Sequence, residues 1–160
     1  MADEFGRAIA KVYVDLRRQI ITLDPASIGI APTGARPMVW AVLLELGYPD
    51  GIATIVAIRD GTASMYTSSG GGLIGGGGRP AVAAEAVRFL DIVDGDIDAL
   101  SPADALQPPG PGHTNIHART FAGNRSGGAL TDELATGSHP LSRMYLAGHE
   151  LITQLRLSSQ

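Results

Sequence analysis

The chain has no cysteine among its 160 residues, which excludes disulfide bonds, thiol catalysis and cysteine-ligated zinc. Positive charge is also scarce, because 12 Lys and Arg stand against 16 Asp and Glu, giving a formal net charge of -4. Without a basic surplus the chain lacks the electrostatic footprint of a nucleic-acid binder, and we expect no nucleic-acid partner.

Long hydrophobic runs are absent too. No apolar stretch reaches the ~18 residues of a membrane span, and the acidic start Met1–Glu4 is unlike a secretion signal. We therefore expect a cytoplasmic protein with no membrane partner. Hydrophobic residues at 44% and charged residues at 18% are typical of a soluble globular protein, and the length fits a single domain over residues 1–160.

Glycine, by contrast, is abundant. Seven of the 21 glycines fall within residues 70–78, between a strand-like segment and a helix start. Each glycine costs roughly 0.5–1 kcal/mol relative to Ala in a regular element. The cluster therefore indicates close backbone approach, positive φ angles or a mobile loop, at a surface where something is held or two backbones meet.

The glycine run offers one candidate ligand site. Gly70-x-Gly72-x-x-Gly75 matches the dinucleotide fingerprint as a string, but it follows an antiparallel hairpin, and no Gly-Lys-Ser/Thr of a P-loop follows it. A weaker hypothesis is an anion nest for a phosphate or carboxylate at the Gly70–Gly78 loop and the start of the next helix. Its candidate residues are Ser69, Gly70, Gly71, Gly72, Gly75, Gly76 and Arg79. The plainer interpretation is a flexible or tightly packed connection.

Apolar spacing predicts three helices. The first begins after Asp3 as its N-cap, with a stripe of Phe5, Ile9, Val12, Leu16 and Ile20. The second covers 80–93, with Pro80 in its first turn and Val82, Ala86, Phe89, Leu90 and Val93 on one face. The third is capped by Ser138, has Pro140 in its first turn, and carries the stripe Leu141, Met144, Tyr145, Gly148, Ile152 and Leu155.

Strand signals lie between these helices. Residues 38–46 fit a buried strand or a short helix, and the turn at 49–51 with the β-prone segment 53–58 after it favours a strand. Asp60-Gly61 then predicts a hairpin into 63–67, and 94–112 reads as a long surface loop. With strands at 113–121 and around 128–130, the order is α-βββ-α-ββ-α. This predicts an α+β fold with a mostly antiparallel five-stranded sheet flanked by three helices, the first and last packing on it.

Other motifs for chemistry are incomplete. Residues 94–98 resemble the opening of a calcium loop, but Ala99 stands where glycine is needed. His149-Glu150 lacks the second histidine of a zinc motif, and no Gly-x-Ser-x-Gly elbow is present. Ser68 or Ser69 with His113, His117 or His139 as base has no spacing to support it. We therefore expect no catalytic residue, no metal site and no cofactor.

Two blocks, TASMYTSSGGGLIGGG at 62–77 and SHPLSRMYLAGHELITQLR at 138–156, resemble a family of uncharacterised bacterial proteins. They cover about a fifth of the chain, and the resemblance implies no particular activity. The predicted topology is also similar to roadblock and longin domains, which are dimeric, non-catalytic partners of small GTPases. The chain departs from that topology by having three strands before the middle helix instead of two.

These observations favour a non-enzymatic protein-interaction or scaffold module that forms a homodimer, with another protein as the further candidate partner. An open sheet leaves edges that must be covered or paired, and few charges lie on residues 53–68 to protect them. The alternative is a small-molecule binder that holds a phosphate or carboxylate at Gly70–Gly78.

Overall fold

The computed structural model describes residues 1–74 and 78–159. Four α-helices lie in this part of the chain: α1 (Lys11–Thr22), α2 (Pro80–Gly95), α3 (Thr131–Ala135) and α4 (Ser142–Ser158). The strands are β1 (Val39–Gly47), β2 (Ile52–Ile58), β3 (Ala63–Thr67), β4 (Gly72–Ile74), β5 (Ser101–Pro102), β6 (His113–Thr120) and β7 (Gly123–Leu130). Short 3₁₀ turns cover Pro25–Ile28 and Ile97–Ala99.

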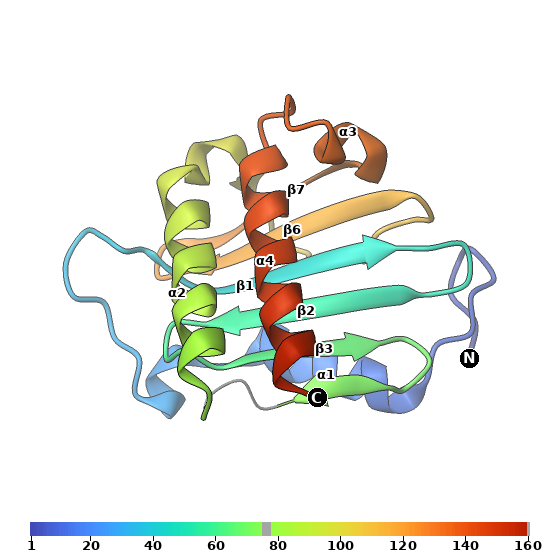
Figure 1. Ribbon diagram of the computed structural model, residues 1–160, viewed down its shortest axis with the longest axis horizontal. Coiled ribbons are helices and arrows are strands. Elements are labelled where there is room, and N and C mark those ends of the chain that lie inside the picture. Colours follow the sequence, from blue (N-terminus) through green and yellow to red (C-terminus); the bar gives the residue numbers. More distant parts are fainter. Residues whose placement is uncertain (75–77, 160) are drawn as a thin grey trace.

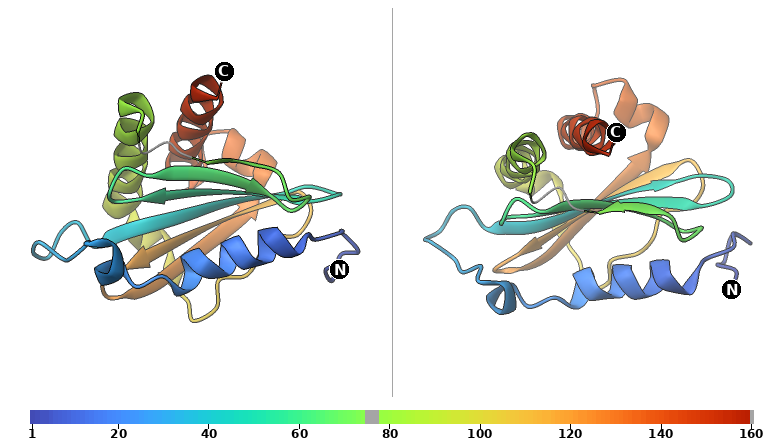
Figure 2. Two further views of the ribbon diagram at one scale, coloured as in Figure 1. Left: turned by 90° about the horizontal axis from the view of Figure 1, so that it is seen from below. Right: turned by 60° about the horizontal axis from the view of Figure 1, so that its bottom comes forward.

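The strands form one sheet in the order β4-β3-β2-β1-β6-β7-β5, and every neighbouring pair is antiparallel. Helices α2 and α4 lie side by side across one face (Figure 1). Helix α1 covers the opposite face, as the two turned views in Figure 2 show. The predicted α+β class and the antiparallel sheet are confirmed.

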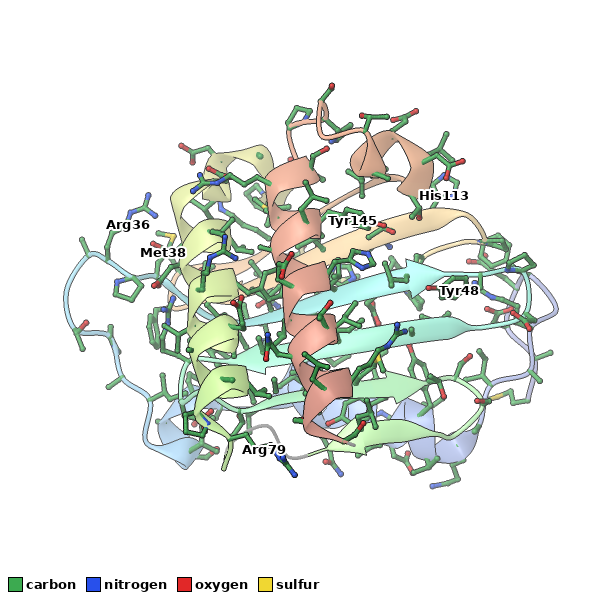
Figure 3. The ribbon with its side chains drawn as sticks, in the orientation of Figure 1. Arg36, Met38, Tyr48, Arg79, His113 and Tyr145 are labelled. Carbon is green, nitrogen blue, oxygen red and sulfur yellow. The ribbon has the colours of Figure 1, made fainter. Side chains whose placement is uncertain are left out.

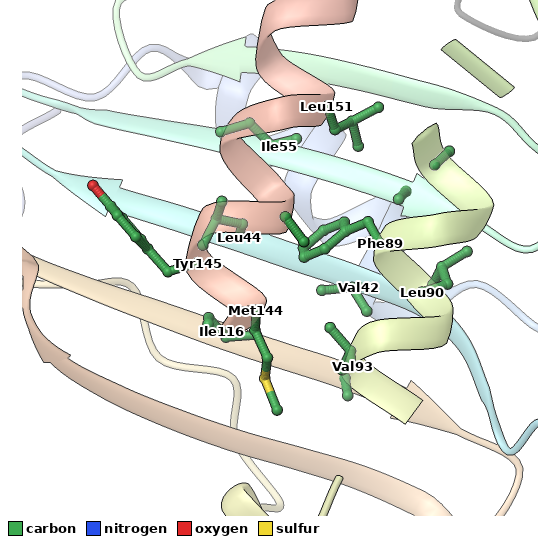
Figure 4. Close-up of a cluster of buried hydrophobic side chains, with 14 of the residues drawn as sticks. Val42, Leu44, Ile55, Phe89, Leu90, Val93, Ile116, Met144, Tyr145 and Leu151 are labelled. Atoms are coloured by element: carbon green, nitrogen blue, oxygen red, sulfur yellow. The ribbon is translucent and has the colours of Figure 1, made fainter. Parts of the chain in front are cut away.

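The main core lies between the sheet and the α2–α4 pair (Figure 4). Side chains alternate across a strand, so β1 sends Val42 and Leu44 to this face and Leu43 to the α1 face. Helix α4 approaches β1 closely, because a Cβ built on Gly148 would come within 2.4 Å of a Leu44 methyl carbon. The predicted stripes of the second and third helices are buried as expected.

The predicted count of five strands is wrong. The segment 38–46 is a strand, as favoured, and the strands predicted at 53–58, 63–67 and 113–121 are present. The last strand is longer than predicted, since β7 covers Gly123–Leu130. Two further strands were missed: β4 lies inside the glycine run, and β5 has only two residues in the segment predicted to be a loop.

The predicted count of three helices is also wrong, since α3 is a fourth. The start of the first helix differs as well, because residues 1–10 are not helical and α1 begins at Lys11. Asp3 does not cap a helix. Its carboxylate accepts hydrogen bonds from the N–H groups of Phe5 and Arg7 and pairs with the Arg7 guanidinium at 2.7 Å. Burial on α1 falls on Tyr13 and Ile20, whereas Val12 of the predicted stripe is exposed.

The beginning of the last helix differs from the prediction too. Helix α4 starts at Ser142, so Ser138 is not its cap and Pro140 precedes its first turn. Two side chains accept backbone hydrogen bonds in the turn before the helix: Ser142 Oγ accepts one from the His139 N–H at 3.1 Å, and His139 Nδ1 accepts one from the Leu141 N–H at 3.0 Å. These bonds hold the turn 139–142 that leads into α4.

Candidate functional site

The predicted anion-site residues fall into two groups. Ser69, Gly70 and Gly71 form the turn between β3 and β4, in which Gly70 has a φ of 105° and donates its N–H to the Thr67 carbonyl at 2.9 Å. Thr67 in turn donates its N–H to the Gly71 carbonyl at 2.9 Å. The Ser69 hydroxyl lies 3.0 Å from Thr67 Oγ1. These polar groups therefore form hydrogen bonds within the turn itself.

Gly72 belongs to β4, where a Cβ would lie 2.6 Å from the Met65 carbonyl oxygen, so only glycine allows this close approach. Arg79 comes after β4, immediately before α2, and lies at the rim of the molecule (Figure 3). A three-residue strand spans about 10 Å and separates Arg79 from the turn. Gly75 and Gly76 lie outside the described residues. The structure therefore brings Ser69–Gly72 together and places Arg79 apart from them.

Strand β4 is the edge of the sheet. Because bonded and non-bonded pairs alternate along an antiparallel ladder, the Thr67–Gly71 hydrogen bond predicts that Leu73 bonds to Met65. The N–H and C=O groups of Gly72 and Ile74 then point away from β3, where no described strand pairs with them. Residues 61–78 contain no Asp, Glu, Lys or Arg, so charged side chains of this segment do not protect the edge.

A second feature is the buried polar cluster between α1 and the sheet, formed by Tyr13, Arg17, Glu45, Thr54, His117 and Ser126. Glu45 on β1 is 0% exposed and lies at its centre. Arg17 donates to both Glu45 oxygens, at 2.9 Å from Nε and 2.7 Å from Nη2. Thr54 donates its hydroxyl at 2.6 Å, and His117 Nε2 lies 3.1 Å from the second oxygen. The carboxylate is therefore fully hydrogen-bonded, as a buried charge requires.

These contacts shift the pKa values of Glu45 and Tyr13. Burial alone would raise the pKa of Glu45, but the hydrogen bonds from Arg17 and His117 outweigh burial and lower it to about 2. Burial raises the pKa of the Tyr13 hydroxyl, and the nearby Glu45 charge raises it further. His117 Nε2 faces two acceptors, the Glu45 carboxylate and the Gln107 carbonyl at 3.0 Å, so Nε2 is a ring nitrogen that donates.

The Ser126 hydroxyl lies 2.7 Å from the other ring nitrogen, Nδ1 of His117. Serine, histidine and carboxylate thus follow one another as in a hydrolase relay, with the imidazole ring reversed. However, His117 is only 2% exposed. Ladder alternation also turns the Gly127 N–H toward β6, so this group does not lie beside Ser126 Oγ as the donor of an oxyanion hole would. The arrangement suits a cluster that holds α1 against the sheet better than one that meets a substrate.

Sequence reasoning missed this cluster. Its one visible signal was Glu45, the only charged residue in the apolar run 38–47. A lone carboxylate in a buried strand needs partners. Of the other candidates, Ser68 has a structural role, since its Oγ accepts a hydrogen bond from the Ile52 N–H at 2.8 Å. His113 is exposed, while His149 packs edge-on against Tyr145 on α4.

Beside the cluster lies a cavity of 310 Å³, called the α1 cavity below. It is bounded by α1, the N-terminal segment, the start of β2 and the loop before β6, and its accessible lining is mostly apolar. Its lining includes Ile9, Tyr13, Val14, Arg17, Arg18, Ile52 and Pro108. Tyr13 and Arg17 therefore belong to both the cavity and the cluster.

Within residues 1–74 and 78–159, no three His, Asp or Glu side chains are grouped so that they could hold a metal ion. None of the described helices combines the length and hydropathy that a membrane crossing requires. The chain was compared with protein-family models, curated proteins and solved structures, and none of the three comparisons found a match.

Proposed function

We propose that this protein is a non-enzymatic interaction module that forms a homodimer by strand addition at the β4 edge. The observation that carries the proposal is this edge itself: it is uncharged over residues 61–78, and no described strand pairs with its outer side. Edges of this kind are templates for another strand, and proteins that leave them free usually protect them with charge or proline. Here pairing would provide the protection.

The β4 edge suits a two-fold pairing. If two β4 strands meet antiparallel, the outward groups of Gly72 and Ile74 in one copy face the same groups in the other. Val12 on α1 flanks the turn into β4: it is 50% exposed, and its Cγ1 would lie 3.5 Å from a Cβ on Gly70. An apolar side chain beside the edge would add contact area to the backbone hydrogen bonds of such a dimer.

The other end of the sheet is less open. There β5 pairs with part of β7, and Arg125 on β7 donates to the Leu100 carbonyl at 2.8 Å. A charged, partly paired end is a poorer template than β4. A strand from another protein is the further candidate occupant of the β4 edge, since the backbone groups that would pair two copies can equally pair a foreign strand.

The test removes one outward donor. Ile74→Pro deletes the N–H that points to the free edge, whereas Ile74→Ala makes a comparable loss of side chain and keeps the N–H. Sedimentation or light scattering should show a concentration-dependent dimer for the wild type and for Ile74→Ala. For Ile74→Pro we expect at least a tenfold weaker dimer with unchanged circular dichroism.

Two outcomes would contradict the proposal. A wild-type protein that stays monomeric up to hundreds of micromolar excludes the dimer, and equal dimerisation of the two Ile74 variants excludes the β4 edge as its site. The anion-binding alternative for Gly70–Gly78 has less support, because Arg79 lies apart from the turn. Stabilisation by phosphate or carboxylates that is lost in Arg79→Ala would favour that alternative over the dimer as the role of this segment.

A further inference from the structure

The α1 cavity has the dimensions of a small-ligand site. Its 310 Å³ offers room for about ten groups of the size of a water molecule. This volume lies at the lower end of the ~300–1,000 Å³ found for ligand pockets. The aliphatic side chains of Ile9, Val14 and Ile52 and the ring of Pro108 line it, and water gains few hydrogen bonds against such walls. An apolar tail would therefore displace poorly held water.

Two arginines from the second half of α1 also line the cavity. Arg17 uses Nε and Nη2 for Glu45, and Nη2 also donates to the Leu106 carbonyl. Within the described residues its Nη1 donates to no protein acceptor, and the Arg17 side chain is 12% exposed. Arg18 is largely exposed, and its contact with Asp15 is long, at 3.5 Å. Both guanidinium groups retain donors for a ligand.

The acidic groups near the cavity are already compensated. Asp3 also lines it, but Arg7 pairs with this carboxylate at 2.7 Å. Glu45 is fully buried beneath Arg17 and hydrogen-bonded by Arg17, Thr54 and His117. The Arg18 end of the cavity therefore favours an anionic group, and a charge-assisted hydrogen bond to carboxylate is the strong form of such a contact.

We propose that the α1 cavity binds a small amphipathic carboxylate about the size of octanoate. The apolar tail lies along Ile9, Val14, Ile52 and Pro108, and the carboxylate accepts hydrogen bonds from Arg17 Nη1 and Arg18. This site is independent of the proposed dimer, because none of its lining residues belongs to β4. Ile74→Pro should therefore bind the ligand as tightly as the wild type does, which lets the two proposals fail separately.

Calorimetric titration of the full chain with octanoate, below its micellar range, tests the site. We expect saturable binding of one octanoate per chain, with 1-octanol at least tenfold weaker because it carries no charge. Val14→Phe fills the cavity and should abolish binding, and Arg18→Gln should weaken it severalfold. Arg143→Gln, which removes an exposed arginine on α4, is the matched control and should bind as the wild type does.

Thermal unfolding of each variant establishes that it is folded before titration. Three results overturn the proposal: no saturable binding by the wild type, equal affinity for octanoate and 1-octanol, or unchanged binding by a folded Val14→Phe. If Arg143→Gln weakens binding as much as Arg18→Gln does, the effect is one of overall charge, and the assignment of the carboxylate to Arg18 fails.

Discussion

At the scale of single residues, Glu45 shows what a sequence reveals and what it withholds. Its position inside the apolar run 38–47 indicates a charge on a buried strand, and that much can be read directly. Its partners cannot be identified from the sequence, because Arg17 lies 28 residues and His117 lies 72 residues from Glu45 along the chain. Only the antiparallel pairing of β1 with β6 and the packing of α1 bring the three side chains together.

The lowered pKa of Glu45 predicts a specific dependence of stability on pH. Relative to an ordinary value of 4.5, a folded pKa of about 2 contributes roughly 3 kcal/mol of stability. Because the folded pKa is the lower one, this stability is complete above pH ~4.5 and is lost as pH falls toward 2. At neutral pH, Glu45→Gln should destabilise the protein by roughly 3 kcal/mol, since it leaves the partly buried Arg17 guanidinium without its counter-charge.

Urea unfolding between pH 7 and 2 measures this effect. The difference in free energy of unfolding between the wild type and Glu45→Gln should become smaller below pH ~4.5, because Glu45 itself becomes protonated there. Glu150→Gln removes an exposed carboxylate from α4 and is the control. Its free energy of unfolding should change with pH in the same way as that of the wild type. A gap for Glu45→Gln that stays constant down to pH 2 would show that the ion pair does not govern acid stability.

At the scale of elements, pattern strength decided which predictions succeeded. The stripes of α2 and α4 face a large apolar core, so their periodicity is clear and both helices were found. Helix α1 rests partly on polar contacts made by Tyr13 and Arg17, which an apolar periodicity cannot register, and its start was placed too early. Strands β4 and β5 have three and two residues, too few to show any period.

The close contact of α4 with β1 gives a prediction about packing. Gly148→Ala would gain helix propensity, but its Cβ would fall 2.4 Å from Leu44 Cδ2 in a fully buried site. We expect the steric cost to win, with a net loss of about 1 kcal/mol in the free energy of unfolding. Gly95→Ala, at the end of α2 with open space around it, is the control and should be neutral or stabilising by up to about 1 kcal/mol.

Chemical denaturation of these two glycine variants distinguishes packing from propensity. Helix propensity alone predicts that both variants are more stable than the wild type. Packing predicts that Gly148→Ala is less stable and that Gly95→Ala is not. Adding Leu44→Ala to Gly148→Ala should make the two changes less than additive in cost, because the smaller side chain leaves room for the new Cβ. Full additivity would mean that the contact between α4 and β1 relaxes without strain.

At the scale of the whole molecule, the two faces of the sheet are held in different ways. The face toward α2 and α4 buries a large cluster of apolar side chains, including Leu44, Phe89 and Leu151 (Figure 4). The α1 face has a small apolar cluster of Ile20, Leu43 and Val56, and polar contacts, above all those around Glu45, supply much of the rest of its contact with α1. Apolar burial contributes most of the stability of a domain, so the two layers should differ in local stability.

This difference predicts the order of opening in native-state hydrogen exchange. Amides of α1 should exchange through a local opening that needs less free energy than global unfolding, while amides of β1 and α4 exchange only with global unfolding. Glu45→Gln should lower the protection of α1 more than that of α4, because Arg17 anchors the helix to that carboxylate. Octanoate, if bound in the α1 cavity, should raise the protection of α1 selectively. Equal protection of α1 and α4 in the wild type would instead mean that both layers open as one unit, and that the polar cluster holds α1 as firmly as the apolar core holds α4.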